Sequence, residues 1–425
     1  MKLPQISDSA IRAGLDAAVH KNLMPAASER VYPGHFTISA DGEAYGSDTT
    51  WPGLDSWQMA GAYLLLGKLR MVQDYFDFVR ASQRKDGNIP FAIFNGDTRP
   101  DDTYLRGLKY PADLFTYVPP KREGLPDSSQ QTRQWIGLFD HWEQPSNPLG
   151  ALAPVCYLLT AAEIWDADAD RTWMTTRIES VEKAAEHLAT MISGNGLMSG
   201  SGFYTELPPR WEWDGVTQCY AVHAWRELAR LERGLGRQSE AARFVRLADA
   251  LASRFVSEFW REDHFGEYVH ISHGLVDLHG LSDTNWAAVA FGLADDGKLK
   301  KLWPRLLAAK EFWRGVMPTQ TVTEPFTYQD WENDPVPWKT AGPTNDVAAM
   351  GRVWFLEASA CVRMRDFSRL TEAARLVSHA AEDGFWRERY PPDPNGGVKQ
   401  AQASKYEEYP AILARVVLGN ASRLG

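Results

Sequence analysis

The chain has 425 residues, a formal net charge of −10 at pH 7, 44% apolar residues and 24% charged residues. This balance is typical of a folded globular protein with a large core and argues against intrinsic disorder. The negative charge disfavours binding to nucleic acid, whose phosphates would be repelled. Residues 1–14 lack the apolar segment of a signal peptide, and no apolar run is long enough to span a membrane. We therefore expect a cytoplasmic protein that binds neither nucleic acid nor membrane.

Helical periodicity recurs along the chain from residue 56 onward. In 56–82, apolar residues follow the i, i+3, i+4, i+7 spacing of one buried helix face, which predicts a long helix or a tight helix pair. Residues 226–260 predict an αα-hairpin, with Gly236 ending its first helix. Strand-like alternation is almost absent. Further helical patterns cover 149–165, 172–192, 217–234, 239–260, 286–293, 347–362, 367–381 and 403–418.

Four long loops rich in Pro, Gly and Trp separate these helices, at 97–123, 194–215, 316–343 and 387–402. Loops of that length in a compact domain usually carry function. Consecutive helix pairs with long loops on one side predict an all-α fold, a single (α/α)6 barrel over residues 1–425, in which the loops form a pocket. A superhelical repeat array would also contain helix pairs, but the residues show no fixed period.

The sequence lacks the standard motifs of nucleotide, zinc-protease and serine-hydrolase sites. Its cysteines, Cys156, Cys219 and Cys361, are far apart and have no zinc-ligand spacing, so we expect no disulfide framework, no metal and no cofactor. The 17 Trp residues are unusually many. A Trp ring either fills the core or offers a flat platform on which the apolar face of a sugar can stack.

Acidic residues stand among aromatic residues in four short segments. A carboxyl group beside Trp and Pro is partly desolvated, which favours the protonated form of a general acid, whereas a carboxylate beside Arg stays charged and can act as a base. Glycoside hydrolysis needs such a pair, one to protonate the leaving oxygen and one to activate water or attack carbon. The segments are TWPGLDSWQMAGAYLLLG (50–67), FYTELPPRWEWDG (203–215), PWKTAGPTND (337–346) and FWRERYPPDPNGG (385–397).

In this order the four segments resemble those of glycoside hydrolase family 63 and its relatives, which include mannosylglycerate and glucosylglycerate hydrolases and processing α-glucosidases. The resemblance extends over residues 51–418. It implies an (α/α)6 barrel that hydrolyses a small, α-linked glycoside or oligosaccharide by an inverting acid/base mechanism. A small carbohydrate is therefore the expected partner, and assembly into a homo-oligomer is left open.

The resemblance implies roles for two carboxyl groups. Glu206 falls where the family's Asp-x-Ser-Pro-Arg-Trp motif has its general acid, but Glu is one methylene longer, so Asp214 is kept as a second candidate. Glu388, in Trp-Arg-Glu-Arg-Tyr-Pro, falls where the family has the general base that directs water at the anomeric carbon. Glu407 and Glu408 compete for that role. A surface ion pair with a neighbouring arginine is the structural alternative for Glu388.

Other residues are implied to bind substrate. By resemblance, Asp55 binds the sugar at the cleaved end, although an Asp in that place is also a common helix N-cap. Arg210 is expected to brace its loop or contact the ligand and not to react. The tryptophans beside the acids are expected to be sugar platforms more often than core residues. The full set is Trp51, Asp55, Trp57, Gln144, Arg210, Trp211, Asp214, Trp338 and Tyr406.

Two other functions remain open from the sequence. A sugar isomerase of the N-acylglucosamine 2-epimerase kind uses a similar barrel but needs a pair of inward-facing histidines, for which His223 and the group from His270 to His279 are candidates. A non-catalytic sugar binder would keep the aromatic residues with a decayed acid, as the change from Asp to Glu at position 206 allows. The sequence does not decide the sugar, the linkage or the stereochemical outcome.

Overall fold

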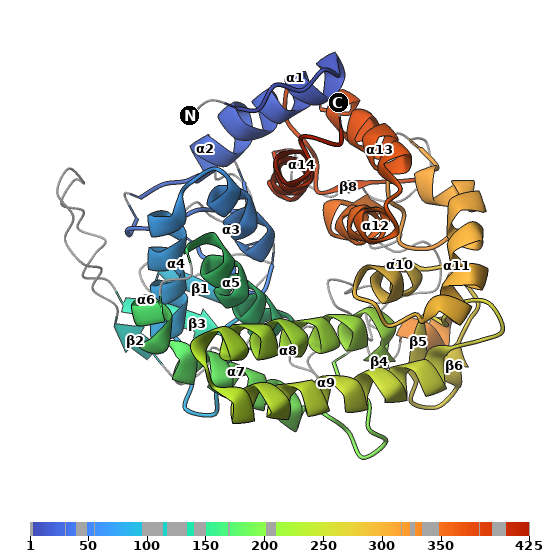
Figure 1. Cartoon of the computed structure of the whole chain (residues 1–425), viewed down its shortest axis with the longest axis horizontal. Helices are drawn as coiled ribbons and strands as arrows, with labels where there is room; N and C mark the ends of the chain where they lie inside the picture. The colour runs from blue at the N-terminus through green and yellow to red at the C-terminus, as the bar shows by residue number, and fades with distance from the viewer. Residues whose placement is uncertain are drawn as a thin grey trace.

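The helices form two concentric rings (Figure 1). In the described part of the chain, the inner helices contact one another in chain order, and the last, α14, returns to contact the first, α3. This closure confirms the predicted (α/α)6 barrel and excludes an open superhelical array. The inner helices are α3 (Ser56–Leu65), α5 (Leu152–Asp168), α8 (Gly215–Leu235), α10 (Asp283–Ala290), α12 (Gly351–Met364) and α14 (Glu408–Gly419). The computed structural model describes residues 3–29, 31–39, 49–54, 56–95, 114–116, 134–139, 150–168, 171–200, 210–315, 317–323, 328–333, 348–381, 383–392 and 405–424.

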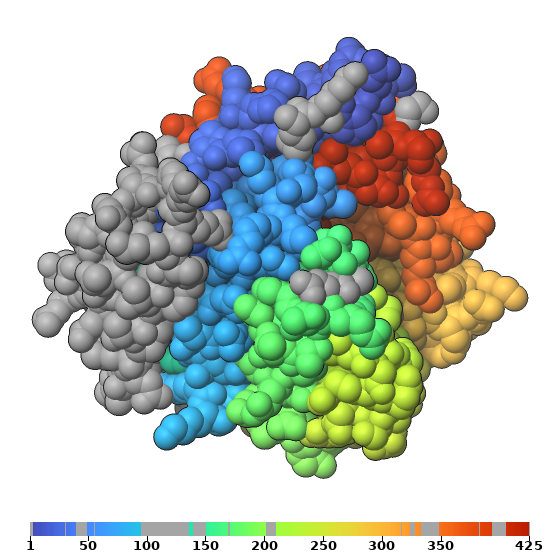
Figure 2. All heavy atoms as spheres, turned by 60° about the vertical axis from the view of Figure 1, so that its left-hand side comes forward, coloured from blue at the N-terminus to red at the C-terminus, as the bar shows by residue number. Residues whose placement is uncertain are grey.

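The outer helices pack behind the inner ring. Helix α7 packs on α5, α9 on α8 and α11 on α10, while α1 packs against α13 and α14 and so joins the two ends of the chain (Figure 1). On the flank in Figure 2, α4 (light blue) lies beside the segment that follows α5 (green), where Asp77 accepts from Arg177 at 2.5 Å. The outer helices are α1 (Ser9–Ala17), α4 (Leu69–Ala81), α7 (Ile178–Thr190), α9 (Gln238–Phe259), α11 (Asp296–Ala308) and α13 (Phe367–His379). Short helical segments are η1 (Ala18–Leu23), α2 (Met24–Ala26), α6 (Arg171–Thr175), η3 (Lys310–Trp313) and η4 (Asp330–Asn333).

The two rings differ in how much surface they bury. Inner helix α5 is buried along most of its length, whereas outer helix α9 buries one stripe at helical spacing and exposes its other face. Three tryptophans on inner helices, Trp225, Trp286 and Trp354, are fully buried. Part of the high Trp content therefore fills the space in and between the rings.

Most predicted helices are confirmed. The segment 56–82 is a pair of helices, α3 and α4, separated at Gly67, whose φ of +72° is in the left-handed region that glycine adopts at little cost. Gly236 ends α8 with φ +85°, as predicted for the hairpin. Helices α1 and α11 were not predicted; α11 fully buries only Leu302 and Leu306, and Pro304 lies inside it.

The inner helices all begin at the same end of the barrel, because an outer segment returns the chain before each new inner helix starts. We call this end the loop face. Short antiparallel strands border it, and β4 and β7 run directly into the starts of α8 and α12. The strands are β1 (Ala92–Asn95), β3 (Gln134–Leu138) and β2 (Leu114–Thr116) in one sheet, β4 (Glu212–Asp214), β5 (Tyr268–His270) and β6 (Gly274–Val276) in a second, and β7 (Ala349–Met350) with β8 (Arg389–Tyr390) in a third. Among the described helices, none is both long and apolar enough to cross a bilayer.

Candidate active site

A buried arginine with three carboxylates lies at the starts of α8 and α10, and we call these four residues the Arg210 cluster. The Arg210 guanidinium lies 2.9 Å from Asp214 (Nη1–Oδ1), 2.9 Å from Glu267 (Nε–Oε1) and 3.0 Å from Asp283 (Nη1–Oδ1). All four residues are buried. Asp214 is the N-cap of α8, and Asp283 is the first residue of α10.

The carboxylate oxygens of the Arg210 cluster are occupied by protein donors. Asp214 Oδ2 accepts from the Thr217 backbone N–H at 2.7 Å and from the Thr217 hydroxyl at 2.9 Å. Glu267 Oε2 lies 2.6 Å from His279 Nδ1, and its Oε1 accepts from the Tyr328 hydroxyl at 2.9 Å. These contacts hold the carboxylates of Asp214 and Glu267 in fixed positions.

The buried charges of this cluster shift one another's pKa values. Burial by itself raises the pKa of Glu267, but the adjacent Arg210 and His279 outweigh it and lower the pKa to about 2. Burial by itself lowers the pKa of His279, but Glu267 beside it raises the pKa to about 9. For Asp283, burial is the largest effect and raises the pKa to about 7 against the opposing pull of Arg210, with Asp214 adding to the rise.

A second arginine-centred group, the Arg352 cluster, joins the starts of α12 and α14 and comprises Arg352, Glu388 and Glu408. The backbone N–H of Arg352 donates to Glu408 Oε1, and its Nε donates to the same oxygen at 3.2 Å. Its Nη2 lies 3.1 Å from Glu408 Oε2 and 3.3 Å from Glu388 Oε1. Arg389 adds a second cation, with Nη2 3.0 Å from Glu388 Oε1.

Strand pairing brings Glu388 to this place. Arg389 pairs with Met350, and Tyr390 pairs with Ala349, so β8 is aligned against the two residues that precede α12. Glu388, directly before β8, is thereby placed beside Arg352, the second residue of α12. The start of a helix carries positive partial charge from its free N–H groups, which favours carboxylates there.

The described contacts of the Glu388 carboxylate fall on one of its two oxygens. Its ion pairs with Arg352 and Arg389 both involve Oε1, and within the described part of the chain no hydrogen bond reaches Oε2. The residue is 4% exposed. Glu388 does form the ion pair with a neighbouring arginine that was the alternative to a catalytic role, but this pair is buried and not on the surface. The remaining oxygen is in a position to accept a proton from a water or a ligand.

The other predicted residues fall into three groups. Arg210 and Asp214 lie inside the Arg210 cluster, and Trp211 is partly exposed beside it. Trp51, Trp57 and Tyr406 are buried. Outside the described residues lie Glu206, Asp55, Gln144 and Trp338.

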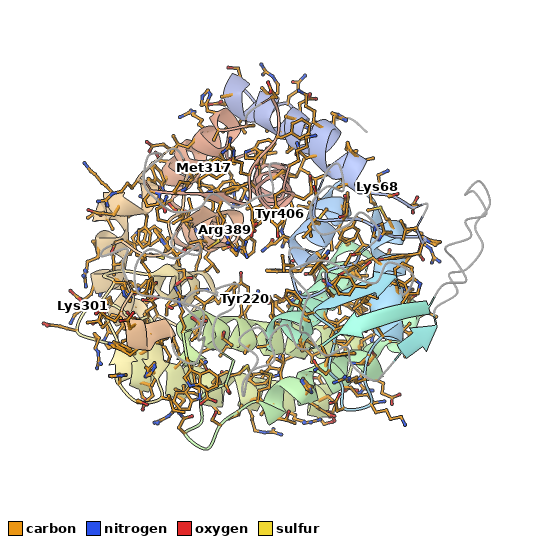
Figure 3. All side chains as sticks on the ribbon, turned by 180° about the vertical axis from the view of Figure 1, so that it is seen from behind. Lys68, Tyr220, Lys301, Met317, Arg389 and Tyr406 are labelled. Carbon is orange, nitrogen blue, oxygen red and sulfur yellow. The ribbon has the colours of Figure 1, made fainter. Side chains whose placement is uncertain are left out.

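Trp57 packs as a core residue. It is 2% exposed, and its Nε1 donates to Glu163 at 2.9 Å. Its ring packs edge-on against Phe355, with the ring centroids 5.2 Å apart. Stacking on a sugar needs an exposed ring face, so the burial of Trp57 does not support the platform role, which stays a prediction. Figure 3 shows other side chains around the centre of the ring, among them Tyr220, Arg389 and Tyr406.

Sequence reasoning missed Arg352, Glu267 and Asp283. Asp283 and Arg352 stand at the starts of segments with helical periodicity, as the predicted Asp214 does. A polar or charged residue directly before an apolar helical run was therefore a usable signal. Glu267 carries no such signal, because only β-strand pairing brings it to the cluster: β4 pairs with β5, which begins at the next residue.

Two of the histidines proposed for an isomerase, His223 and His279, are engaged in separate contacts. His223, on α8, stacks on Phe291 with ring centroids 4.3 Å apart, and burial lowers its pKa to about 4. His279 is bound to Glu267 in the Arg210 cluster. Neither contact presents the two imidazoles as a pair for proton transfer at carbon. Among the described residues, no group of three or more His, Cys, Asp or Glu side chains is arranged to hold a metal ion.

Comparison with known proteins gives a likeness of fold. No protein-family model matches the chain, and no curated protein matches its sequence. A rhamnosidase from Klebsiella oxytoca with rhamnose bound superposes with a TM-score of 0.64 at 12% identity, covering 99% of this chain and 66% of that one. A family GH78 rhamnosidase of a Bacillus species gives 0.61 at 14% identity, covering 98% of this chain and 35% of that one.

A mannosylglycerate hydrolase of family GH63 matches in length as well. The enzyme from Thermus thermophilus, in complex with Tris and D-glycerate, has a TM-score of 0.61 at 14% identity, covering 96% of this chain and 99% of that one. This chain thus spans about a third of the length of the Bacillus rhamnosidase, two thirds of the Klebsiella rhamnosidase and nearly all of the mannosylglycerate hydrolase. It has the (α/α)-barrel fold that these glycosidases share.

Proposed function

We propose that the protein is a glycoside hydrolase that acts on a small glycoside by inversion, with Glu388 as the general base. The observation that carries this proposal is the state of the Glu388 carboxylate: buried on the loop face, held at Oε1 by two guanidinium groups, and with no described hydrogen bond at Oε2. The two guanidinium groups fix the carboxylate through Oε1, so that Oε2 is the oxygen that would accept the proton.

In the proposed reaction, Glu388 Oε2 takes a proton from a water as the water oxygen bonds to the anomeric carbon. The bond from that carbon to the leaving oxygen breaks, and the leaving oxygen takes a proton from the general acid. We assign the acid to Glu206, which lies outside the described residues. Asp214 is the weaker candidate, because Arg210 and Thr217 occupy both of its oxygens.

Arg352 has a positioning role in this proposal. Its guanidinium makes two contacts to Glu408, its backbone N–H makes a third, and the same Nη2 reaches Glu388. A guanidinium offers several donors in a rigid plane and can serve two carboxylates at once, which the single ammonium group of lysine does less well. Glu408 therefore anchors the arginine, and this supports Glu388 over Glu408 as the base.

The solved glycosidases of similar fold support the reaction class, and their printed substrates suggest which sugars to try first. The test is hydrolysis of a panel of aryl glycosides and glycosylglycerates that includes rhamnosides, mannosides and glucosides. Wild-type protein is compared with Glu388→Ala, Glu206→Ala and the matched control Glu262→Ala, whose side chain is exposed.

We expect hydrolysis of at least one α-glycoside with inversion, seen by NMR of the first-formed anomer. Both site variants should lose most of the activity, and the control should keep it. Full activity in Glu388→Ala would contradict the assignment of the base. Binding of sugars by the wild-type protein without any turnover would favour the non-catalytic binder.

A further inference from the structure

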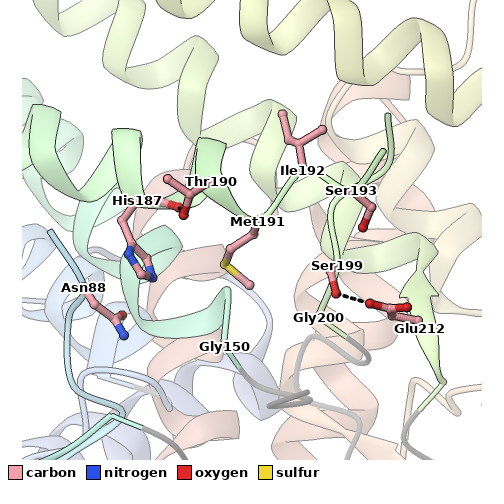
Figure 4. Close-up of a pocket in the computed structure, with 10 residues that line it drawn as sticks. All are labelled: Asn88, Gly150, His187, Thr190, Met191, Ile192, Ser193, Ser199, Gly200 and Glu212. Atoms are coloured by element: carbon pink, nitrogen blue, oxygen red, sulfur yellow. Dashed lines mark hydrogen bonds between the residues drawn. The ribbon is translucent and has the colours of Figure 1, made fainter. Parts of the chain in front are cut away.

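Two polar regions of the barrel differ in whether they contact the proposed base. A groove of about 440 Å³ lies between the end of α7 and β4, and there the Ser199 hydroxyl donates to Glu212 Oε1 at 2.6 Å (Figure 4). No described contact joins that groove to Glu388. Arg389, in β8, lies with Nη2 3.0 Å from Glu388 Oε1. Besides Arg352, it is the described side chain that touches the proposed base.

Arg389 extends from β8 toward the centre of the barrel. Successive side chains of a strand point to opposite faces, and the neighbouring Tyr390 packs edge-on against Tyr409 of α14, with ring centroids 5.7 Å apart. Arg389 therefore leaves the strand on the face opposite to this core contact, and Figure 3 shows it near the centre of the ring. Its partner in β7 is Met350, directly before α12, so the start of α12 fixes the strand that carries it.

The side chains around Glu388 differ in how far they are buried. The Glu408 side chain is 0% exposed, and those of Arg352 and Glu388 are 6% exposed, whereas that of Arg389 is 14% exposed. Arg352 thus holds Glu388 from the protein side, where its contacts with Glu408 lie, and Arg389 holds it from the more accessible side. A ligand that approaches Glu388 from solvent meets Arg389 before it meets Arg352.

A guanidinium can hold the base and a ligand at the same time, because it carries five N–H donors in one rigid plane. The contact of Arg389 with Glu388 is made by Nη2. In the proposed reaction a water lies between Glu388 Oε2 and the anomeric carbon, and the hydroxyl on carbon 2 is the ring hydroxyl next to that carbon. Hydrogen bonds to the 2-hydroxyl stabilise the transition state of glycoside hydrolysis. A donor beside the base is therefore well placed to supply one.

We propose that Arg389 is a substrate-binding residue, whose guanidinium holds Glu388 and donates a hydrogen bond to the 2-hydroxyl of the sugar. The assignment rests on the proposed function, which places the anomeric carbon at Glu388. It gives the two arginines different tasks: Arg352 positions the base, and Arg389 positions the base and the sugar together. It also defines the substrate class as glycosides with a free 2-hydroxyl, and disfavours 2-deoxy and 2-acetamido sugars.

The test compares sugars that differ only at carbon 2. The probes are glucose or mannose against 2-deoxyglucose, and rhamnose against 2-deoxyrhamnose, titrated by NMR into wild-type protein, Arg389→Met and the exposed control Arg261→Met. These monosaccharides contain no glycosidic bond, so they are not consumed. We expect the wild-type protein to bind the 2-hydroxyl member of at least one pair about tenfold more tightly, as one hydrogen bond from a charged donor predicts. Arg389→Met should reduce this ratio to about twofold or less, and Arg261→Met should keep it.

Two lysine variants separate contact with the sugar from positioning of the base. Arg352→Lys should keep the wild-type ratio, because Arg352 is assigned to the base alone. Arg389→Lys retains a cation beside Glu388 but lacks the planar set of donors, so it should lower the ratio, and it replaces Arg389→Met if that variant does not fold. An unchanged ratio in the Arg389 variants, an equal fall in Arg352→Lys, or no binding of any of these sugars would overturn the assignment.

Hydrolysis of aryl glycosides by the wild-type protein is scored separately from sugar binding. Turnover together with a ratio that does not depend on Arg389 refutes only the role of Arg389. A ratio that depends on Arg389 without any turnover refutes only the reaction, and leaves Arg389 as the residue by which a sugar-binding protein recognises the 2-hydroxyl.

Discussion

The Arg210 and Arg352 clusters both combine an arginine with carboxylates at the starts of neighbouring inner helices. They differ in how many oxygens of these carboxylates accept a described contact. In the Arg210 cluster the carboxylate oxygens of Asp214 and Glu267 are taken by Arg210, Thr217, His279 or Tyr328. In the Arg352 cluster, both described contacts of Glu388 fall on one oxygen.

The difference teaches that a buried carboxylate beside an arginine is not by itself a sign of catalysis. Sealing all the oxygens produces a structural junction, which here ties β4, β5 and the starts of α8 and α10 together. An oxygen without a described contact, as in Glu388, fits the base that we propose. Substitutions that disrupt one cluster at a time test this difference.

The largest expected effect is the loss of stability on removing the cation from the Arg210 cluster. Arg210→Met leaves three buried carboxylates without their shared partner, and we expect the free energy of unfolding to fall by about 3–5 kcal/mol. Urea unfolding followed by circular dichroism measures it. The control is Arg230→Met, because Arg230 makes its ion pairs at 40% side-chain exposure, where the loss should be about 0–1 kcal/mol. Equal losses in the two variants would show that the cluster is not a structural junction.

A smaller effect should follow from Arg352→Lys. The ammonium group keeps the charge but cannot hold Glu408 and Glu388 in the same way, so we expect kcat to fall about tenfold with little change in KM. An unchanged kcat with a raised KM would instead place Arg352 in substrate binding.

The smallest effect is a pH dependence of stability carried by His279. Its pKa is raised from 6.5 to about 9 by Glu267, so its contribution is fully present below about pH 6.5 and is lost as the pH rises through about 9. Glu332 also faces this imidazole, at 3.5 Å. Melting temperatures measured across that window should fall for the wild-type protein and fall less for His279→Gln. Parallel curves for the two proteins would show that His279 is not charged in the folded state.

The fold could be predicted from the sequence where burial alone decides the pattern. The apolar periodicity of α8, α9 and α13 and the glycine after α8 were sufficient to place those helices. Helix α11 was missed because its sequence is charged and contains Pro304.

The candidate site was predictable only in part. Glu388 was found through its motif, but the sequence could not reveal that Arg352, 36 residues earlier, would lie beside it. That contact depends on the pairing of β7 with β8, two strands of two residues each, which are too short to leave a periodic signal. For the same reason Arg210 and Asp214 could be singled out as a motif without their partners Glu267 and Asp283.

The most direct test of the two-cluster account is the kcat of folded protein for Glu388→Gln beside Asp214→Asn, on whichever glycoside the wild-type protein hydrolyses. The account predicts that Glu388→Gln lowers kcat by about 10²–10⁴-fold at an unchanged melting temperature, as loss of a general base does. Asp214→Asn should lower the melting temperature, while the folded fraction keeps most of its kcat. Retained activity in Glu388→Gln, or an inactive but fully stable Asp214→Asn, would contradict it.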